Sequence, residues 1–235
     1  MFANLTPTTP HGPQSDPDAT HISVILDRSG SMESIREDTI GGFNTFLNVQ
    51  RRQPGKATVT LVQFDSQDPY EVIHRFRPVA EVPELTGETY VPRASTPLLD
   101  AVGRGINDLE ANLADILPAH RPSKVIFVVI TDGQENASRE FRRERIVKMI
   151  QDKEAHYGWQ FLFLSADLDA VQDAENQGFQ ARFSLAFDKT GRGTRDAWGS
   201  VSEKISNVRY SKKLSAAFTD EDRAKQQIER KRRKS

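Results

Sequence analysis

The sequence contains no cysteine, which excludes disulfide bonds, thiolate metal sites and thiol catalysis. No apolar run approaches the ~18 residues that a membrane-spanning helix needs, and the first residues lack the charged-then-apolar pattern of a signal peptide. The five histidines occur singly rather than in spaced pairs, which argues against a zinc site. The formal net charge of −1 provides no general attraction to nucleic acid or to a membrane surface. We therefore expect a soluble cytoplasmic protein that does not bind membranes.

The composition changes along the chain and predicts three parts. Residues 1–20 are rich in Pro, Thr, Asp and Ser without periodicity, which predicts a disordered segment. Residues 21–210 are long enough for one α/β domain with a full core. Residues 211–235 carry nine Lys or Arg against four Asp or Glu, a local charge of +5. We expect this basic tail to be flexible or helical, and we expect no binding of nucleic acid except through it.

Apolar runs and helical periodicities alternate along the central part, which predicts an α/β fold with a doubly wound, mostly parallel six-stranded sheet and helices on both faces. The short connector 65–69 predicts that the strand after it is an antiparallel edge strand. Strands are predicted over 22–26, 58–64, 71–76, 124–130, 159–164 and 181–187. Helices are predicted over 32–53, 97–117, 139–155, 169–177 and 195–209.

Oxygen-bearing side chains follow two of the predicted strands. Asp27, Ser29 and Ser31 come directly after the strand 22–26, at every second position. Asp132 follows the most apolar strand, 124–130. Carboxylate and hydroxyl oxygens are the ligands that a hard divalent cation prefers, so these residues are candidates for a metal site. Alternatively, they form a polar turn that caps the next helix.

A fifth oxygen comes from the start of a helix. Thr96 is predicted as the N-cap of the helix 97–117, with Pro97 as its first residue. In a doubly wound sheet, ligands bind beyond the carboxyl ends of the strands, where such helices begin. We therefore expect one group of metal-binding residues: Asp27, Ser29, Ser31, Thr96 and Asp132.

Other polar residues are expected at the same edge of the sheet. Asp65 and Asp167 each follow a predicted strand, and each is either a carboxylate near a bound partner or a turn residue. Residues 134–136 (Gln-Glu-Asn) directly follow Asp132 and are expected to influence which partner fits.

Three segments resemble the metal-ion-dependent adhesion site of von Willebrand factor type A domains, of the intracellular prokaryotic type. They are Asp27-Arg-Ser-Gly-Ser31, Ser-Thr96-Pro-Leu-Leu-Asp and Thr-Asp132-Gly, and the resemblance covers about residues 20–210. It implies a Rossmann-like fold in which the three hydroxyls are offered to a metal, while the two aspartates act directly or through water. It also implies Mg²⁺ as the ion, with Mn²⁺ or Ca²⁺ as substitutes, and a Glu or Asp of a partner protein as the last ligand.

The resemblance implies a metal-dependent protein-binding module rather than an enzyme. Intracellular relatives often act beside AAA+ ATPases or in stress-response gene clusters, so such a component is the expected partner. A metal-dependent phosphoester hydrolase is the alternative. Against it, no general base stands out in the sequence, and Ser29 takes the place where a phosphatase of the haloacid dehalogenase type would need Asp. No phosphate-binding loop of the Gly-x-x-x-x-Gly-Lys type occurs either.

Overall fold

A six-stranded sheet forms the centre of the molecule. The computed structural model describes residues 15–166, 179–210 and 215–226. The strand order is β3-β2-β1-β4-β5-β6; β3 pairs antiparallel with β2, and every other pair is parallel. The predicted doubly wound sheet with one antiparallel edge strand is thus confirmed. The strands are β1 (Asp16–Asp27), β2 (Lys56–Phe64), β3 (Glu71–Pro78), β4 (Pro122–Thr131), β5 (Gln160–Ser165) and β6 (Ser184–Ala186).

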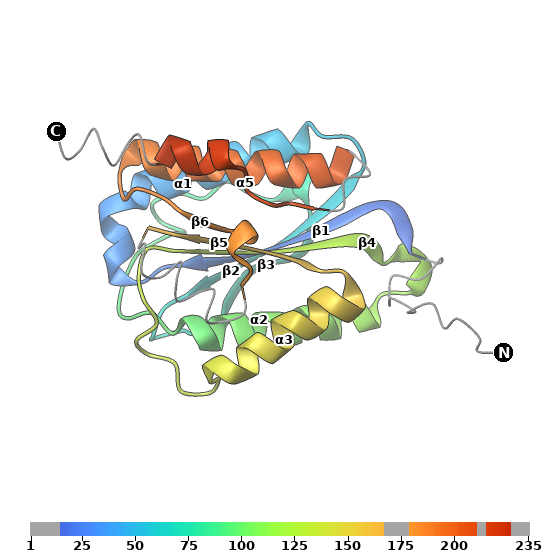
Figure 1. The fold of residues 1–235 in the computed structure, drawn as a ribbon, viewed down its shortest axis with the longest axis horizontal. Helices are drawn as coiled ribbons and strands as arrows, with labels where there is room; N and C mark the ends of the chain where they lie inside the picture. The colour runs from blue at the N-terminus through green and yellow to red at the C-terminus, as the bar shows by residue number, and fades with distance from the viewer. Residues whose placement is uncertain (1–14, 167–178, 211–214, 227–235) are drawn as a thin grey trace.

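Helices cover both faces of the sheet, as predicted. Helices α1 (Arg36–Arg51) and α5 (Gly191–Tyr210) lie on one face, and α2 (Leu98–Asp115) and α3 (Arg143–Tyr157) lie on the other (Figure 1). Side chains alternate along the central strand, so that Val24 and Leu26 join the core under α1 and α5, whereas Ile25 joins the core under α2 and α3. This burial of both faces explains why the central strands are almost continuously apolar.

Strand β1 begins earlier than the sequence predicts. The expected disordered segment over residues 1–20 is wrong for residues 16–20, which belong to β1. Thr20 lies opposite Lys124 of β4, and the Asp16 carboxylate lies 2.9 Å from the Lys56 ammonium at the start of β2. Pairing with neighbouring strands satisfies the backbone hydrogen-bonding groups of this polar stretch. Its composition alone would not predict an ordered strand.

The fold also extends further toward the C-terminus than predicted. In the expected tail, Ala216 and Phe218 are buried, and the Asp222 carboxylate lies 2.8 Å from the buried ammonium of Lys204. The backbone N–H of Phe218 donates to the carbonyl of Arg182, just before the edge strand β6. Residues 215–226 therefore belong to the domain, because their apolar side chains find a place beside an otherwise open sheet edge.

The predicted helix over 169–177 and Asp167 lie outside the described residues. So do residues 1–14 of the expected disordered segment and residues 211–214 and 227–235 of the expected basic tail. Within the described ranges, no helix has both the length and the apolar character needed to cross a membrane.

Candidate metal centre

The carboxyl ends of β1 and β4 bring the first residues of the centre together. The two strands are parallel neighbours with Leu26 opposite Ile130, so Asp27 and Asp132 leave the sheet at the same edge. The Ser29 and Ser31 hydroxyl oxygens lie 3.1 Å apart, and Ser31 Oγ donates to Asp132 Oδ1 at 2.5 Å. The structure thus joins two segments that are 101 residues apart in the sequence.

Thr96 reaches the same place from the loop before α2. A Cβ built on Gly133 would meet Ser31 Oγ at 3.4 Å and Thr96 Oγ1 at 3.5 Å, so both hydroxyls face the backbone of this glycine. The carboxamide oxygen of Asn136 accepts the backbone N–H of Thr96 at 2.9 Å, which fixes the threonine against the loop after β4. All five predicted residues therefore lie in one group.

The prediction that Thr96 caps α2 is wrong. The N-cap position belongs to Pro97, and its side chain makes no capping hydrogen bond. Instead, Glu135 Oε2 accepts the N–H of Leu99, and Ser138 Oγ accepts the N–H of Asp100. Because the loop after β4 supplies the caps, the Thr96 hydroxyl is not engaged in helix capping.

Asp27 is held rigidly in a fully buried position. Its Oδ1 accepts the N–H of Ser29 at 2.6 Å, its Oδ2 accepts the hydroxyl of Thr131 at 2.6 Å, and its carbonyl accepts the Tyr90 hydroxyl at 2.6 Å. Burial raises the pKa of the Asp27 carboxyl to about 7, against the lowering effect of these hydrogen bonds, and the nearby charge of Asp132 raises it further. A cation at this point would relieve the repulsion between the two carboxylates.

The donor set fits a hard divalent ion. It contains only oxygen: three hydroxyls and two carboxylates. Donors bound at about 2.1 Å around an octahedral Mg²⁺ lie about 3 Å apart, close to the separations between Ser29, Ser31 and Asp132. Among the described residues, no three His, Cys, Asp or Glu side chains form a metal-binding group. An all-carboxylate or imidazole site is therefore absent from this part of the chain, and the hydroxyl-rich centre is the candidate.

Comparison with known proteins identifies the fold. No protein-family model and no curated protein matches the sequence. Among solved structures, a von Willebrand factor type A protein from Catenulispora acidiphila is similar, with a TM-score of 0.53, 10% identity, and 80% of this chain and 43% of that chain covered. The chain has the von Willebrand factor type A fold.

Two further type A neighbours were solved with a metal. The manganese-loaded TRAP protein of Plasmodium vivax has a TM-score of 0.51 and 13% identity over 73% of this chain and 69% of that one. Mussel byssus proximal thread matrix protein 1, with a zinc-occupied adhesion site, has a TM-score of 0.52 and 14% identity over 81% of this chain. The alignment spans only 45% of the mussel protein, so the likeness is to one part of it.

Sequence reasoning missed one residue that contacts the centre. The Lys189 ammonium lies 2.5 Å from Asp132 Oδ2 and donates to the Ser31 carbonyl at 2.8 Å. Lys189 follows β6, whose carboxyl end reaches the same sheet edge, so the topology indicated the region. No motif singled out the lysine itself, because it lies 57 positions beyond Asp132 along the chain.

Asp65, which follows β2, stabilises the turn after this strand. It is fully buried and pairs with Arg28 at 2.7 Å and with Arg93 at 2.9 Å. Its Oδ1 also accepts the N–H groups of Gln67 and Asp68. Burial alone would raise the pKa of Asp65, but these N–H groups and the two guanidinium groups hold it below its usual value. Of the two interpretations of Asp65, the structure favours the turn residue.

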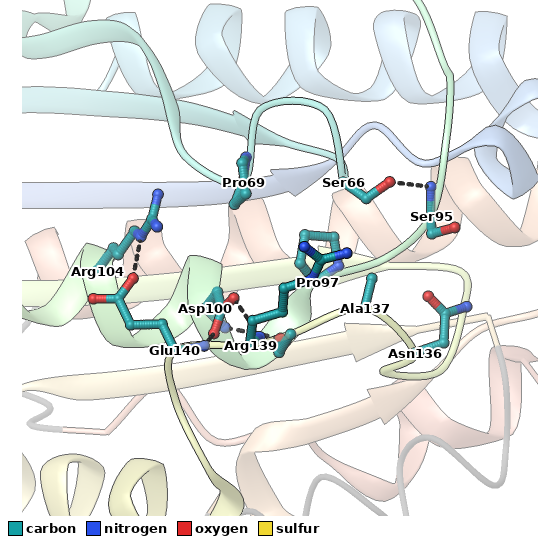
Figure 2. A pocket seen from close by; sticks show the side chains of 11 residues that line it. Ser66, Pro69, Ser95, Pro97, Asp100, Arg104, Asn136, Ala137, Arg139 and Glu140 are labelled. Carbon is teal, nitrogen blue, oxygen red and sulfur yellow. Dashed lines mark hydrogen bonds and ion pairs between the residues drawn. The ribbon is translucent and has the colours of Figure 1, made fainter.

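A polar groove of about 640 Å³ begins beside Thr96. Figure 2 shows Ser95 and Pro97, the two neighbours of Thr96, across from the loop that carries Asn136 and Arg139. The buried Asp100 carboxylate accepts the N–H groups of residues 139–141 and so holds the wall that bears Arg139. The groove therefore leads away from the candidate metal centre.

Proposed function

We propose that this protein is a metal-dependent protein-binding module that docks a Glu or Asp of a partner through Mg²⁺. The observation that carries the proposal is the convergence of three hydroxyls and two carboxylates at one sheet edge. The charges of Asp27 and Asp132 balance that of a divalent ion, while the hydroxyls add none. An open coordination position on such an ion favours an anionic ligand over water.

The roles of the residues follow from their positions. Ser29, Ser31 and Thr96 would hold the ion with neutral oxygens, and Asp132 would supply charge beside them. Each carboxylate oxygen of Asp27 already accepts a hydrogen bond, from Ser29 or from Thr131. Asp27 would therefore interact with the ion through its charge or through a bound water. The bound ion supplies a positive charge that attracts the carboxylate of the partner.

The hydrolase alternative gains no support from the site. None of the described histidines forms a hydrogen bond with a residue of the centre. Asp27 is engaged through both carboxylate oxygens, and Lys189 pairs with Asp132, so neither is placed as a free base. Incubating the Mg²⁺ protein with a generic phosphoester tests this alternative directly, and turnover that Asp132→Ala abolishes would revive it.

The partner class rests on the resemblance in the sequence. We expect an AAA+ ATPase or a stress-response component that presents an acidic residue, in the cytoplasm. The partner chain on either side of that residue would lie over the groove that begins at Ser95 and Pro97. Arg139 on the groove wall favours a partner segment that carries further acidic residues.

The experiment has two steps. Affinity capture in Mg²⁺ and again in EDTA identifies a partner, and calorimetry then measures its binding to wild type, Asp132→Ala and Asp152→Ala. Asp152 is a matched control because it lies on α3 and pairs with Lys153 and His156. We expect Asp132→Ala to lose Mg²⁺ and most of the partner affinity, with Asp152→Ala unchanged. A folded Asp132→Ala protein that binds the partner as tightly as wild type would exclude this site as the interface.

A further inference from the structure

A cationic side chain of the protein itself, that of Lys189, contacts the centre. Lys189 Nζ lies 2.5 Å from Asp132 Oδ2 and 2.8 Å from the Ser31 carbonyl oxygen. The Asp132 side chain is fully buried, whereas that of Lys189 is 31% exposed. The ammonium therefore approaches from solvent and pairs with one of the two carboxylates proposed to face the metal.

The backbone around Lys189 is fixed independently of this contact. The N–H of Asp188 donates to Gln226 Oε1 at 3.0 Å, and the N–H of Thr190 donates to the Asp188 carbonyl at 2.7 Å. The Gln226 carboxamide also donates to the carbonyl of Gly193 at the start of α5. The segment 215–226 thus supports the Lys189 backbone beside the centre, so the ammonium would leave Asp132 by rotation about the bonds of its own side chain.

The charges of the centre do not accommodate both cations. With both carboxyl groups ionised, as binding of a cation requires, Asp27 and Asp132 contribute −2, and Lys189 reduces this to −1. With Mg²⁺ alone the sum is 0, but Mg²⁺ and Lys189 together leave +1 within a largely buried site, where repulsion is poorly screened. A divalent ion coordinated by Asp132 Oδ2 would also compete directly with Lys189, because the ammonium pairs with this same oxygen.

We infer that Lys189 is a tethered competitor for the divalent ion, and that its ammonium must leave Asp132 when the metal binds. This inference rests on the proposed metal-dependent function. The competition makes the centre bind metal more weakly than its oxygen donors alone would. In the ion-free protein, the ammonium compensates the charge of the buried Asp132 carboxylate.

Calorimetric titration with Mg²⁺, and melting curves in EDTA and in saturating Mg²⁺, test the inference. Lys189→Met removes the charge and keeps an unbranched side chain. Lys56→Met is the control, because Lys56 pairs with Asp16 near the amino end of the parallel strands, opposite the centre. We expect Lys189→Met to bind Mg²⁺ about tenfold more tightly than wild type, since one competing contact charge is removed. Lys56→Met should stay within about twofold, as surface pairs contribute little.

The melting curves separate competition from a merely structural role. In EDTA, Lys189→Met should have a lower melting temperature than wild type. Saturating Mg²⁺ should raise the melting temperature of Lys189→Met by more than it raises that of wild type. Lys189→Arg keeps the charge and should retain the weaker binding of wild type. Should wild type bind Mg²⁺ while Lys189→Met binds it equally or more weakly, the inference is overturned and the proposed function stands. If neither protein binds a divalent ion, the proposed function itself fails, and the inference with it.

Discussion

At the scale of single residues, the two carboxylates of the centre have different surroundings. Each carboxylate oxygen of Asp27 accepts a hydrogen bond, one from the N–H of Ser29 and one from the hydroxyl of Thr131. Asp132 contacts the hydroxyl of Ser31 and the ammonium of Lys189. The Asp27 carboxylate is therefore held in place by its neighbours, whereas Asp132 is the carboxylate for which Lys189 and a divalent ion are proposed to compete.

Removing the Thr96 hydroxyl should affect metal binding and not stability. Thr96→Val keeps the side-chain shape, and α2 is capped by Glu135 and Ser138 instead. We expect the free energy of unfolding to change by less than about 0.5 kcal/mol, while the Mg²⁺ affinity falls several-fold. Urea unfolding and calorimetry measure the two effects. Ser95→Ala, one position earlier on the rim, is the control, and a large loss of stability in Thr96→Val would contradict the capping assignment.

His21 should make the protein less stable in acid. Its ring is fully buried, with Nδ1 2.8 Å from Thr58 Oγ1, and burial lowers its pKa to about 3. The unfolded chain takes up a proton near pH 6.5, so the stability contributed by the neutral ring is complete above that pH and is lost as the pH falls toward 3. At pH 5 the free energy of unfolding is lower by about 2 kcal/mol because of this group.

Urea unfolding at pH 7.5 and pH 5 measures this effect. The difference in unfolding free energy between the two pH values should shrink by that amount in His21→Gln. Exposed His120 serves as the control through His120→Gln. An unchanged pH dependence in His21→Gln would show that His21 is not responsible.

At the scale of elements, the open edge of the sheet at β6 is covered by the segment 215–226. The Arg223 guanidinium donates to the carbonyl of Ser184 in β6, and Phe218 is buried beside the strand. The same segment supports the loop that carries Lys189. The end of the described chain therefore affects both the sheet and the centre.

Truncation should separate this segment from the basic end of the chain. Removing residues 215–235 exposes the core that Phe218 covers and leaves the buried Lys204 ammonium without Asp222. We expect a loss of at least ~2 kcal/mol in unfolding free energy. Removing only residues 227–235 is the control and should change it little. Equal stability of the two truncated proteins in urea would contradict the packing described for this segment.

At the scale of the whole molecule, the metal centre lies outside the two apolar cores. Both cores consist mainly of residues of the sheet and of the helices that cover it, with the centre at the carboxyl ends of β1 and β4. We therefore expect folding not to depend on the ion, unlike in small domains whose core is their metal.

EDTA should leave the protein folded. Mg²⁺ should raise the unfolding free energy only by the linkage amount RT ln(1 + [L]/Kd), about 3 kcal/mol at a hundredfold excess over Kd. Thermal melts followed by circular dichroism, with EDTA and with increasing Mg²⁺, measure this dependence. Loss of helical signal at room temperature in EDTA would contradict it.

The sequence alone determined the order of the strands and of the described long helices, and it determined which five residues lie together at the candidate centre. Apolar periodicity reports which faces are buried, and polar residues that directly follow strands are placed by the parallel topology at one edge. Only the tertiary structure decided that Glu135 and Ser138 cap α2, that residues 16–20 extend β1, that residues 215–226 cover β6, and that Lys189 pairs with Asp132. Each of these depends on contacts between segments distant in the chain, and such contacts leave no periodic pattern in the residues around them.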